Sequence, residues 1–215
     1  MATVTENKGR TAPQRSKPGK KAASGQNSLE VPEALIYEMD NGMPIYYRGY
    51  KEVLAGTKQA EEVMGSSIVQ SRVISRLLKF LFRHLPDEQY EVLGNELGLL
   101  FKKNSWRACD IAVFEQEKLK EVQFSNEYAK VPPKIVIEVD TKADMESAES
   151  VEQYYHRKTE QLLQFGVEQV VWIFTAEPRK IMIAVPNADW RITDWTSEIE
   201  LLPGLSFRLS DLMKK

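Results

Sequence analysis

The sequence predicts an α/β domain, bordering on α+β, with a mixed central β-sheet flanked by helices. The first observation is a β-α-β pattern, in which a helix over 151–166 lies between apolar runs at 134–139 and 170–174. Such a unit predicts two parallel strands joined by a crossover helix. The second observation is that an amphipathic helix and three strand-like runs come in this order: 66–85, 90–101, 109–114 and 134–139.

The elements before the long helix are short. Asn41-Gly42 separates two tyrosine-containing runs within 35–50 and predicts a hairpin turn, with a loop as the alternative. A short helix is expected near 50–55. The long helix can begin at Ser66 or Ser67, which are N-cap residues, and Pro86 ends it.

The long helix also carries a row of cations. Arg72, Arg76, Lys79 and Arg83 recur at helical spacing on a face away from the apolar stripe. The ordinary interpretation is a solvated helix face. The sharper one is a stripe that follows the phosphates of a nucleic acid.

After the sheet core, further strands are expected to complete the domain. Pro132-Pro133 stiffen the chain just before the run 134–139. Gly166 suits the C′ position of the crossover helix. The runs 180–185, 190–195 and 202–213 close the domain, the last as a short terminal helix.

Composition divides the 215 residues into a tail, 1–28, and a domain, 29–215. The tail holds six Lys or Arg against one acid and is expected to be disordered. It is either a solvated or leftover segment or an arm with affinity for phosphates. The single Cys109 excludes a disulfide framework and fits a reducing compartment. No membrane span or secretion signal is visible, so we expect a cytoplasmic protein.

Two charged residues occupy positions that should be apolar. Lys158 lies within the apolar stripe of the helix 151–166, between Tyr154 and Leu162. Glu138 lies inside the apolar run 134–139. Such departures from the local pattern are typical of functional sites. The alternatives are that Lys158 extends its ammonium to solvent and that Glu138 faces water.

With Asp110, these residues suggest a metal-dependent hydrolase. Asp110 and Glu138 lie on neighbouring predicted strands and can hold Mg²⁺ or Mn²⁺, with the Val139 carbonyl as a third oxygen. A lysine beside the metal can stabilise charge that develops on a phosphodiester. The alternative for Asp110, at the start of its strand, is a turn or cap role. Asp140 is a further candidate ligand, and Lys142 ranks below Lys158 as the lysine.

These residues resemble the Uma2 family, inferred endonucleases of the PD-(D/E)XK superfamily. The resemblance covers about residues 35–213. It departs from the family pattern at Gln70, Cys109 and Asp140, and Thr141 stands where many members have serine. The matching positions are Asp110, Pro132-Pro133, Glu138-Val139, Thr141, Tyr154/Tyr155, Lys158, Gly166-Val167, Trp172 and Leu202-Pro203-Gly204-Leu205.

The resemblance implies a restriction-endonuclease-like nuclease core with Asp110 and Glu138 as metal-binding acids and Lys158 as a catalytic lysine moved from strand to helix. The expected function is a Mg²⁺-dependent DNA endonuclease, with contacts mainly to phosphates and a homodimer as a possible assembly. The alternative is a nuclease-fold protein that no longer cuts and serves as a binding or regulatory module. A third interpretation, a partner-binding structural protein, needs exposed aromatic residues at Tyr46, Tyr47, Trp190 and Trp195.

Overall fold

The computed structural model describes residues 31–214 except 121, 123 and 145–150. Residues 31–215 form one compact unit. The predicted tail over 1–28 and the end of the acidic stretch after the run 134–139 lie outside the described residues. Among the described residues, no helix is both long and apolar enough to cross a membrane.

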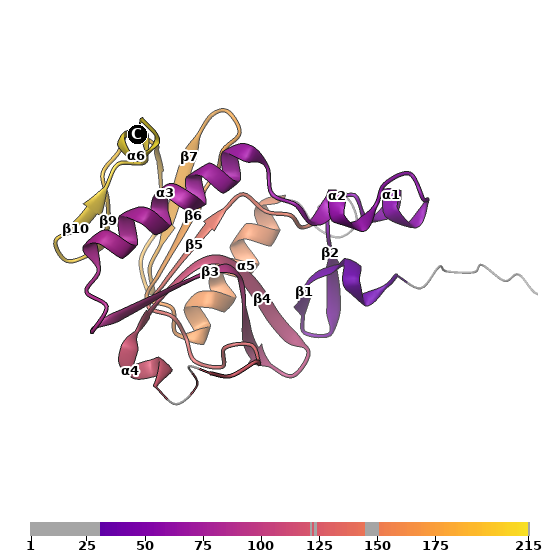
Figure 1. Ribbon diagram of the computed structural model, residues 1–215, viewed down its shortest axis with the longest axis horizontal. Helices are drawn as coiled ribbons and strands as arrows, with labels where there is room; N and C mark the ends of the chain where they lie inside the picture. Colours follow the sequence, from indigo (N-terminus) through magenta and orange to yellow (C-terminus); the bar gives the residue numbers. More distant parts are fainter. Residues whose placement is uncertain (1–30, 121, 123, 145–150, 215) are drawn as a thin grey trace, which may run out of the picture. The chain divides into compact units, whose positions relative to one another are not determined.

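The unit combines a large mixed sheet with helices on both of its faces (Figure 1). The strands are paired in the order β2-β1-β4-β5-β6-β7-β8, and β3 pairs with β4. Of these pairs only β5 and β6 are parallel, as the β-α-β pattern predicts. The predicted fold class is therefore confirmed. The strands of this sheet are β1 Ile36–Asp40, β2 Met43–Tyr46, β3 Tyr90–Lys102, β4 Ser105–Glu115, β5 Ile135–Val139, β6 Gln169–Ile173, β7 Lys180–Ala184 and β8 Arg191–Asp194.

Short elements complete the described part. The hairpin β1–β2 turns at Asn41-Gly42, where both residues have positive φ, as the sequence predicts. A second, two-stranded sheet pairs β9 with β10 near the C-terminus. The remaining elements are a 3₁₀ turn Glu33–Leu35, α1 Tyr50–Leu54, α2 Ala60–Met64, α3 Ile68–His84, α4 Gln116–Leu119, α5 Val151–Phe165, β9 Ile199–Leu202, β10 Leu205–Phe207 and α6 Leu209–Met213.

The helix α3 covers one face of the sheet. It begins at Ser67, whose hydroxyl accepts a hydrogen bond from the backbone N–H of Gln70. Val73, Leu77 and Leu81 have 0 % exposure and pack on the alternate residues of β4 to β7. Each such side chain contributes about 1.5–3 kcal/mol by leaving water.

The helix α5 covers the opposite face (Figure 1). Tyr154 and Leu162 pack there against Val136, Val170 and Trp172, the residues of β5 and β6 that alternate with those under α3. Gly166 follows α5 with φ +113°, as predicted for its C′ position.

The four aromatic residues Tyr46, Tyr47, Trp190 and Trp195 do not form an exposed patch. Trp195 is buried in the α3-side core, whereas Trp190 and Tyr47 are half-buried against the α5-side core. Tyr46 stacks on Tyr50 at 4.6 Å between ring centroids. The interpretation that needs these four aromatic residues on the surface is therefore wrong.

Candidate functional site

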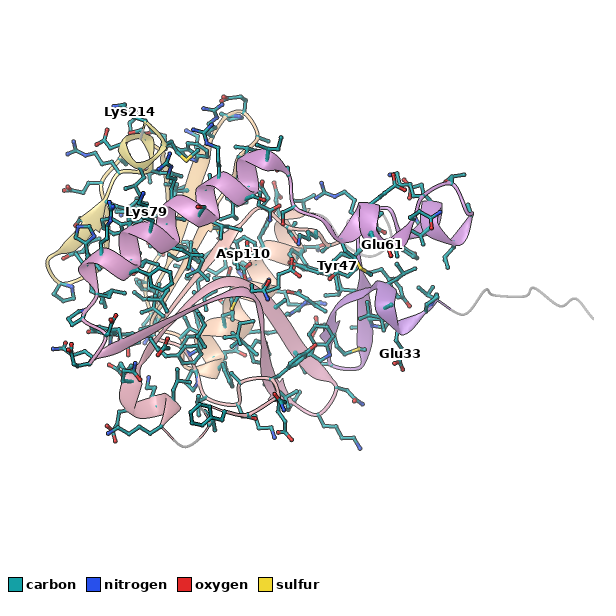
Figure 2. The ribbon with its side chains drawn as sticks, viewed as in Figure 1. Glu33, Tyr47, Glu61, Lys79, Asp110 and Lys214 are labelled. Carbon is teal, nitrogen blue, oxygen red and sulfur yellow. The ribbon has the colours of Figure 1, made fainter. Side chains whose placement is uncertain are left out.

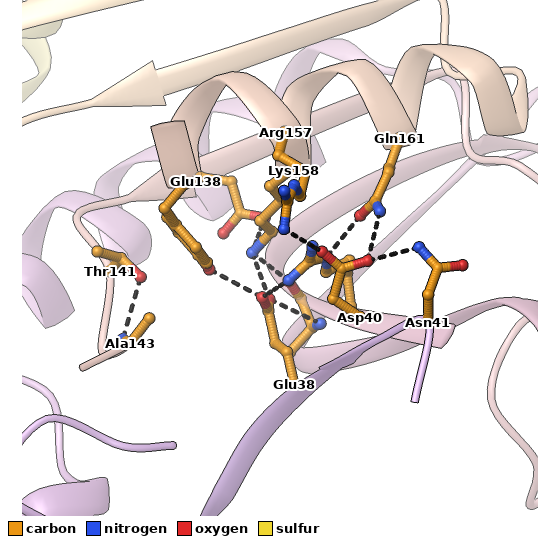
Figure 3. Close-up of polar contacts among 12 residues, drawn as sticks. Glu38, Asp40, Asn41, Glu138, Thr141, Ala143, Arg157, Lys158 and Gln161 are labelled. Carbon is orange, nitrogen blue, oxygen red and sulfur yellow. Dashed lines mark hydrogen bonds and ion pairs between the residues drawn. The ribbon is translucent and has the colours of Figure 1, made fainter. Parts of the chain in front are cut away.

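The centre of the site is Lys158, which points from α5 into the sheet and has 0 % exposure. Its ammonium donates a hydrogen bond to the carbonyl of Ala108 at 2.7 Å. It also lies 2.7 Å from Oε1 of Glu38 and 2.9 Å from Oε1 of Glu138 (Figure 3). Lys158 therefore does not extend to solvent but bridges two buried carboxylates.

Glu38, on β1, is a residue of this network that the sequence reasoning missed. It has 0 % exposure and accepts hydrogen bonds from Arg107 at 2.9 Å, the Tyr154 hydroxyl at 2.8 Å and the Ala108 amide at 3.2 Å. In the sequence, Glu38 stands between Tyr37 and Met39. A charged residue flanked by an aromatic and an apolar residue in the first hairpin was therefore the available signal.

Asp40 extends the network toward the surface, and Arg107 links it to Glu38 (Figure 3). Asp40 accepts hydrogen bonds from Gln161 at 2.8 Å and Arg157 at 3.1 Å. Burial raises the pKa of Asp40, but the hydrogen bond from Gln161 and the charges of Arg107 and Arg157 outweigh it and hold this pKa below its usual range. The sequence analysis also missed Arg107, which has 1 % exposure.

Asp110 lies in the middle of β4, not at the start of a strand, so its interpretation as a turn or cap residue is wrong. It faces a β-bulge in β3, where Asn95 and Glu96, both with positive φ, stand opposite this one residue. Bulges of this kind redirect side chains. The carboxylate of Asp110 accepts a hydrogen bond from the Val139 amide at 2.7 Å, beyond the last paired residues of β4 and β5.

Glu138 has 1 % exposure and points to the α5 side, so it does not face water. Burial raises its pKa from 4.5 to about 8, against the lowering effect of Lys158, and Asp110 and Glu38 raise it further. Burial also raises the pKa of Asp110 from 3.8 to about 6, although the Val139 amide and Lys158 oppose this. The two acids are thus close enough to interact, and both favour protonation more than free carboxyl groups do.

The peptide groups of Val139 are fixed on both sides. Its amide donates to Asp110, and its carbonyl accepts a hydrogen bond from the Gln70 side chain at 2.7 Å. Gln70 is buried at the start of α3. This contact places the carbonyl beside the two acids and leaves its second lone pair available to a ligand.

Asp140 and Lys142 are engaged elsewhere. Asp140 has φ 58° and accepts hydrogen bonds from the Thr175 amide at 2.8 Å and the Thr175 hydroxyl at 2.6 Å. Lys142 forms an ion pair with Glu96. Asp140 therefore fixes the chain after β5 through Thr175, and Lys142 is not the lysine that reaches Glu138.

The donor set suits a small hard cation. Oε1 of Glu138 is buried and lies 2.9 Å from the Lys158 ammonium, but it accepts no hydrogen bond of good geometry from the described residues. Asp110, Glu138 and the Val139 carbonyl supply oxygen donors only, which Mg²⁺ prefers. No group of three or more His, Cys, Asp or Glu side chains in the described part forms a complete metal site. A cation at Asp110 and Glu138 would therefore keep several waters, as Mg²⁺ commonly does.

Only one of these acids borders an accessible space. Asp110 is half-buried and lines a groove of about 740 Å³ between α3 and the β3 bulge. Lys158 and Glu138 lie behind it, in the protein interior. A ligand can reach Asp110 through this groove, and a second hollow of about 690 Å³, lined by Gln70, Asp140 and Thr141, borders the chain just after Val139.

Comparison with known proteins supports the fold. No family model matches the sequence, and no curated protein matches it. The structure is similar to the crystal structure of a presumed nuclease belonging to DUF820 from Anabaena variabilis ATCC 29413, with a TM-score of 0.54 and 16% sequence identity. The match covers 69% of this chain and 82% of that chain. At this identity the similarity shows a shared fold, a mixed sheet flanked by helices.

Proposed function

We propose that this protein is a DNA endonuclease of the PD-(D/E)XK type, dependent on Mg²⁺ or Mn²⁺, and a member of the Uma2 family. The observation that carries the proposal is the convergence of Asp110, Glu138 and Lys158 where β4 and β5 stop pairing. The presumed nuclease activity of the structural neighbour from Anabaena variabilis agrees with it.

In this proposal Asp110, Glu138 and the Val139 carbonyl hold the metal. The bound metal would polarise the phosphodiester and lower the pKa of a water molecule. The residues of the chain prepare this site: the Val139 amide orients Asp110, Gln70 orients the Val139 carbonyl, and Lys158 favours the charged form of Glu138.

Lys158 acts through Glu138. Its ammonium has 0 % exposure and lies 2.9 Å from the Glu138 carboxylate. Because a nearby cation favours the charged form of a buried carboxylate, Lys158 lowers the pH at which Glu138 becomes available as a ligand. This electrostatic role requires no contact between Lys158 and the DNA.

The decisive experiment measures cleavage of supercoiled and linear DNA in Mg²⁺ or Mn²⁺ by the wild type and by Asp110→Asn. The asparagine oxygen can still accept the Val139 N–H, so the fold is retained while the charge is lost. We expect metal-dependent cleavage by the wild type and a loss of about 100-fold or more in the variant. Asp189→Asn, an exposed residue between β7 and β8, is the matched control.

Titration with Mn²⁺ tests the ligands independently of cleavage. We expect Glu138→Gln to lose metal binding, since an amide is a much weaker ligand than a carboxylate. An unchanged Mn²⁺ affinity in this variant would place the ligands elsewhere.

A second candidate function is a nuclease-fold binding or regulatory module that does not cut. The observation that favours it is the enclosure of Lys158 between Glu38 and Glu138, which gives the lysine a structural role. A folded wild type that binds DNA but neither binds Mn²⁺ nor cleaves would support this module over the endonuclease.

A further inference from the structure

One face of α3 carries four cations, of which Arg72, Lys79 and Arg83 are exposed and Arg76 is half-buried. Arg72, Arg76, Lys79 and Arg83 form no ion pair with any described residue, and α3 contains no Asp or Glu. Many other cations in the described part are paired, for example Lys58 with Glu52 and Lys134 with Glu115. Uncompensated cations on one helix face attract a polyanion.

This face borders the groove that leads to Asp110. Lys79 and Arg83 line the groove together with the hydroxyls of Ser71 and Ser75. The carboxylates that line it are Asp110 and Glu96, and Glu96 is paired with Lys142. Figure 2 marks two of the lining residues, Lys79 on α3 and Asp110 on β4. The uncompensated charge is therefore continuous with the accessible side of the proposed site.

The groove also has an apolar side. Ile74, Leu78 and Phe82 line it at intervals of four residues along α3. Phe82 is 57% exposed, so much of its ring is accessible to a ligand. An exposed aromatic ring beside cations is the combination by which proteins bind single-stranded nucleic acids, because the bases stack on the ring while the cations contact phosphates.

We propose that this groove binds an unpaired segment of a nucleic-acid strand, whose phosphates contact Lys79 and Arg83 and whose base stacks on Phe82. Arg72 and Arg76 do not line the groove and add to the positive potential beside it. This inference rests on the proposed function and deepens it, because it names single-stranded or locally unpaired DNA as the substrate class. The strand would pass Asp110 at the inner side of the groove.

Two other occupants fit the groove less well. A duplex keeps its bases stacked on one another and offers no base face to Phe82. A second copy of this chain, docked symmetrically through α3, would bring the same uncompensated cations of two molecules together. An unpaired strand satisfies both the charge and the aromatic ring.

The test measures binding of a fluorescent oligothymidylate of about 16 nucleotides in EDTA, by anisotropy over a series of salt concentrations. The full chain is used throughout, so every variant carries the same N-terminal segment. For Lys79→Gln/Arg83→Gln we expect weaker binding and a salt slope reduced by about 1.4, because each single-strand phosphate that a cation neutralises adds about 0.7 to the slope.

The matched control is Lys102→Gln/Lys103→Gln, which removes the same charge at the β3–β4 turn. Both lysines are exposed, have no ion-pair partner among the described residues and do not line the groove. An equal loss in the control and in the α3 variant would overturn the proposal, because binding would then depend only on net charge.

Phe82 separates a strand-binding groove from a general cationic surface. Phe82→Ala and Phe82→Leu should each weaken single-strand binding at least about fivefold and leave binding of a duplex of the same length unchanged. Equal effects on both ligands, or none on either, would overturn the assignment of Phe82. A dimer that dissociates in the α3 variants, with DNA binding unchanged, would overturn the proposal in favour of a self-association surface.

The binding assay contains no metal and needs no cleavage, so the two proposals fail separately. Binding that depends on α3, without cleavage by the wild type, would reject the endonuclease and keep the groove. Metal-dependent cleavage with binding insensitive to the α3 variants would do the reverse.

Discussion

The two faces of the sheet use the same residue types in opposite ways. On the α5 side, two cations are buried and each contacts two carboxylates. Lys158 contacts Glu38 and Glu138, and Arg107 contacts Glu38 and Asp40. On the α3 side, four cations have no ion-pair partner among the described residues. A buried charge requires a partner because desolvation is costly, whereas a solvated charge does not. The buried cations therefore hold the site together, and the solvated ones remain available to a ligand.

The largest effect on stability is expected for Lys158→Met. Removing this ammonium leaves Glu38 and Glu138 buried without their shared cation, and such a loss typically costs about 3–5 kcal/mol. Urea denaturation at neutral pH measures the change. Lys102→Met, at an exposed position, is the control. An equally small loss of stability in both variants would show that the buried ion pairs of Lys158 contribute nothing.

Glu38→Gln should destabilise the protein less, by about 1.5–3 kcal/mol. The amide can still accept some of the hydrogen bonds, but Arg107 and Lys158 lose one negative partner. Lys158 then has Glu138 as its remaining carboxylate, so Mn²⁺ binding should persist, since Glu38 is not a proposed ligand. Glu33→Gln, exposed at the N-terminal end of the described part, serves as the control.

A pH dependence follows from the raised pKa values of the two acids. The pKa of Glu138 rises from 4.5 to about 8 on folding, so the folded state binds more protons than the unfolded state between these values. Its contribution to the free energy of unfolding is therefore fully present below about pH 4.5 and is lost as the pH rises through about 8.

Comparing the wild type with Glu138→Gln in urea from pH 5 to about 9 isolates this contribution. The wild type should lose stability relative to the variant as the pH rises. Mn²⁺ affinity of the wild type should rise over the same range, because a metal ligand must be deprotonated. A constant difference between the two proteins would contradict the raised pKa of Glu138.

The smallest effect on stability is expected on the α3 side. Lys79→Gln/Arg83→Gln removes two exposed side chains that have no ion pair with any described residue, so the free energy of unfolding should change by no more than about 0.5 kcal/mol. Urea denaturation checks this value. A larger loss would mean that these side chains support the fold, which would weaken their assignment to ligand binding.

Local pattern was sufficient for most of the fold. The Ser67 cap and the apolar stripe predicted α3, and the apolar run before α5 predicted β5. The β-α-β order predicted the parallel pair of β5 and β6. Strand limits were less well predicted. The strand expected over 109–114 extends over Ser105–Glu115, because the long pairing with β3 continues past its apolar centre.

By itself, the sequence determined that Lys158 and Glu138 are charges in apolar elements, because periodicity of 3.6 or 2 residues is local and visible in the chain. Only the tertiary structure decided what surrounds them. Strand pairing between distant segments brings Glu38 to Lys158 and Arg107 to Glu38, and Asp110, opposite the β3 bulge, reaches the Val139 amide. These contacts depend on the register of strands far apart in sequence, which no local pattern specifies.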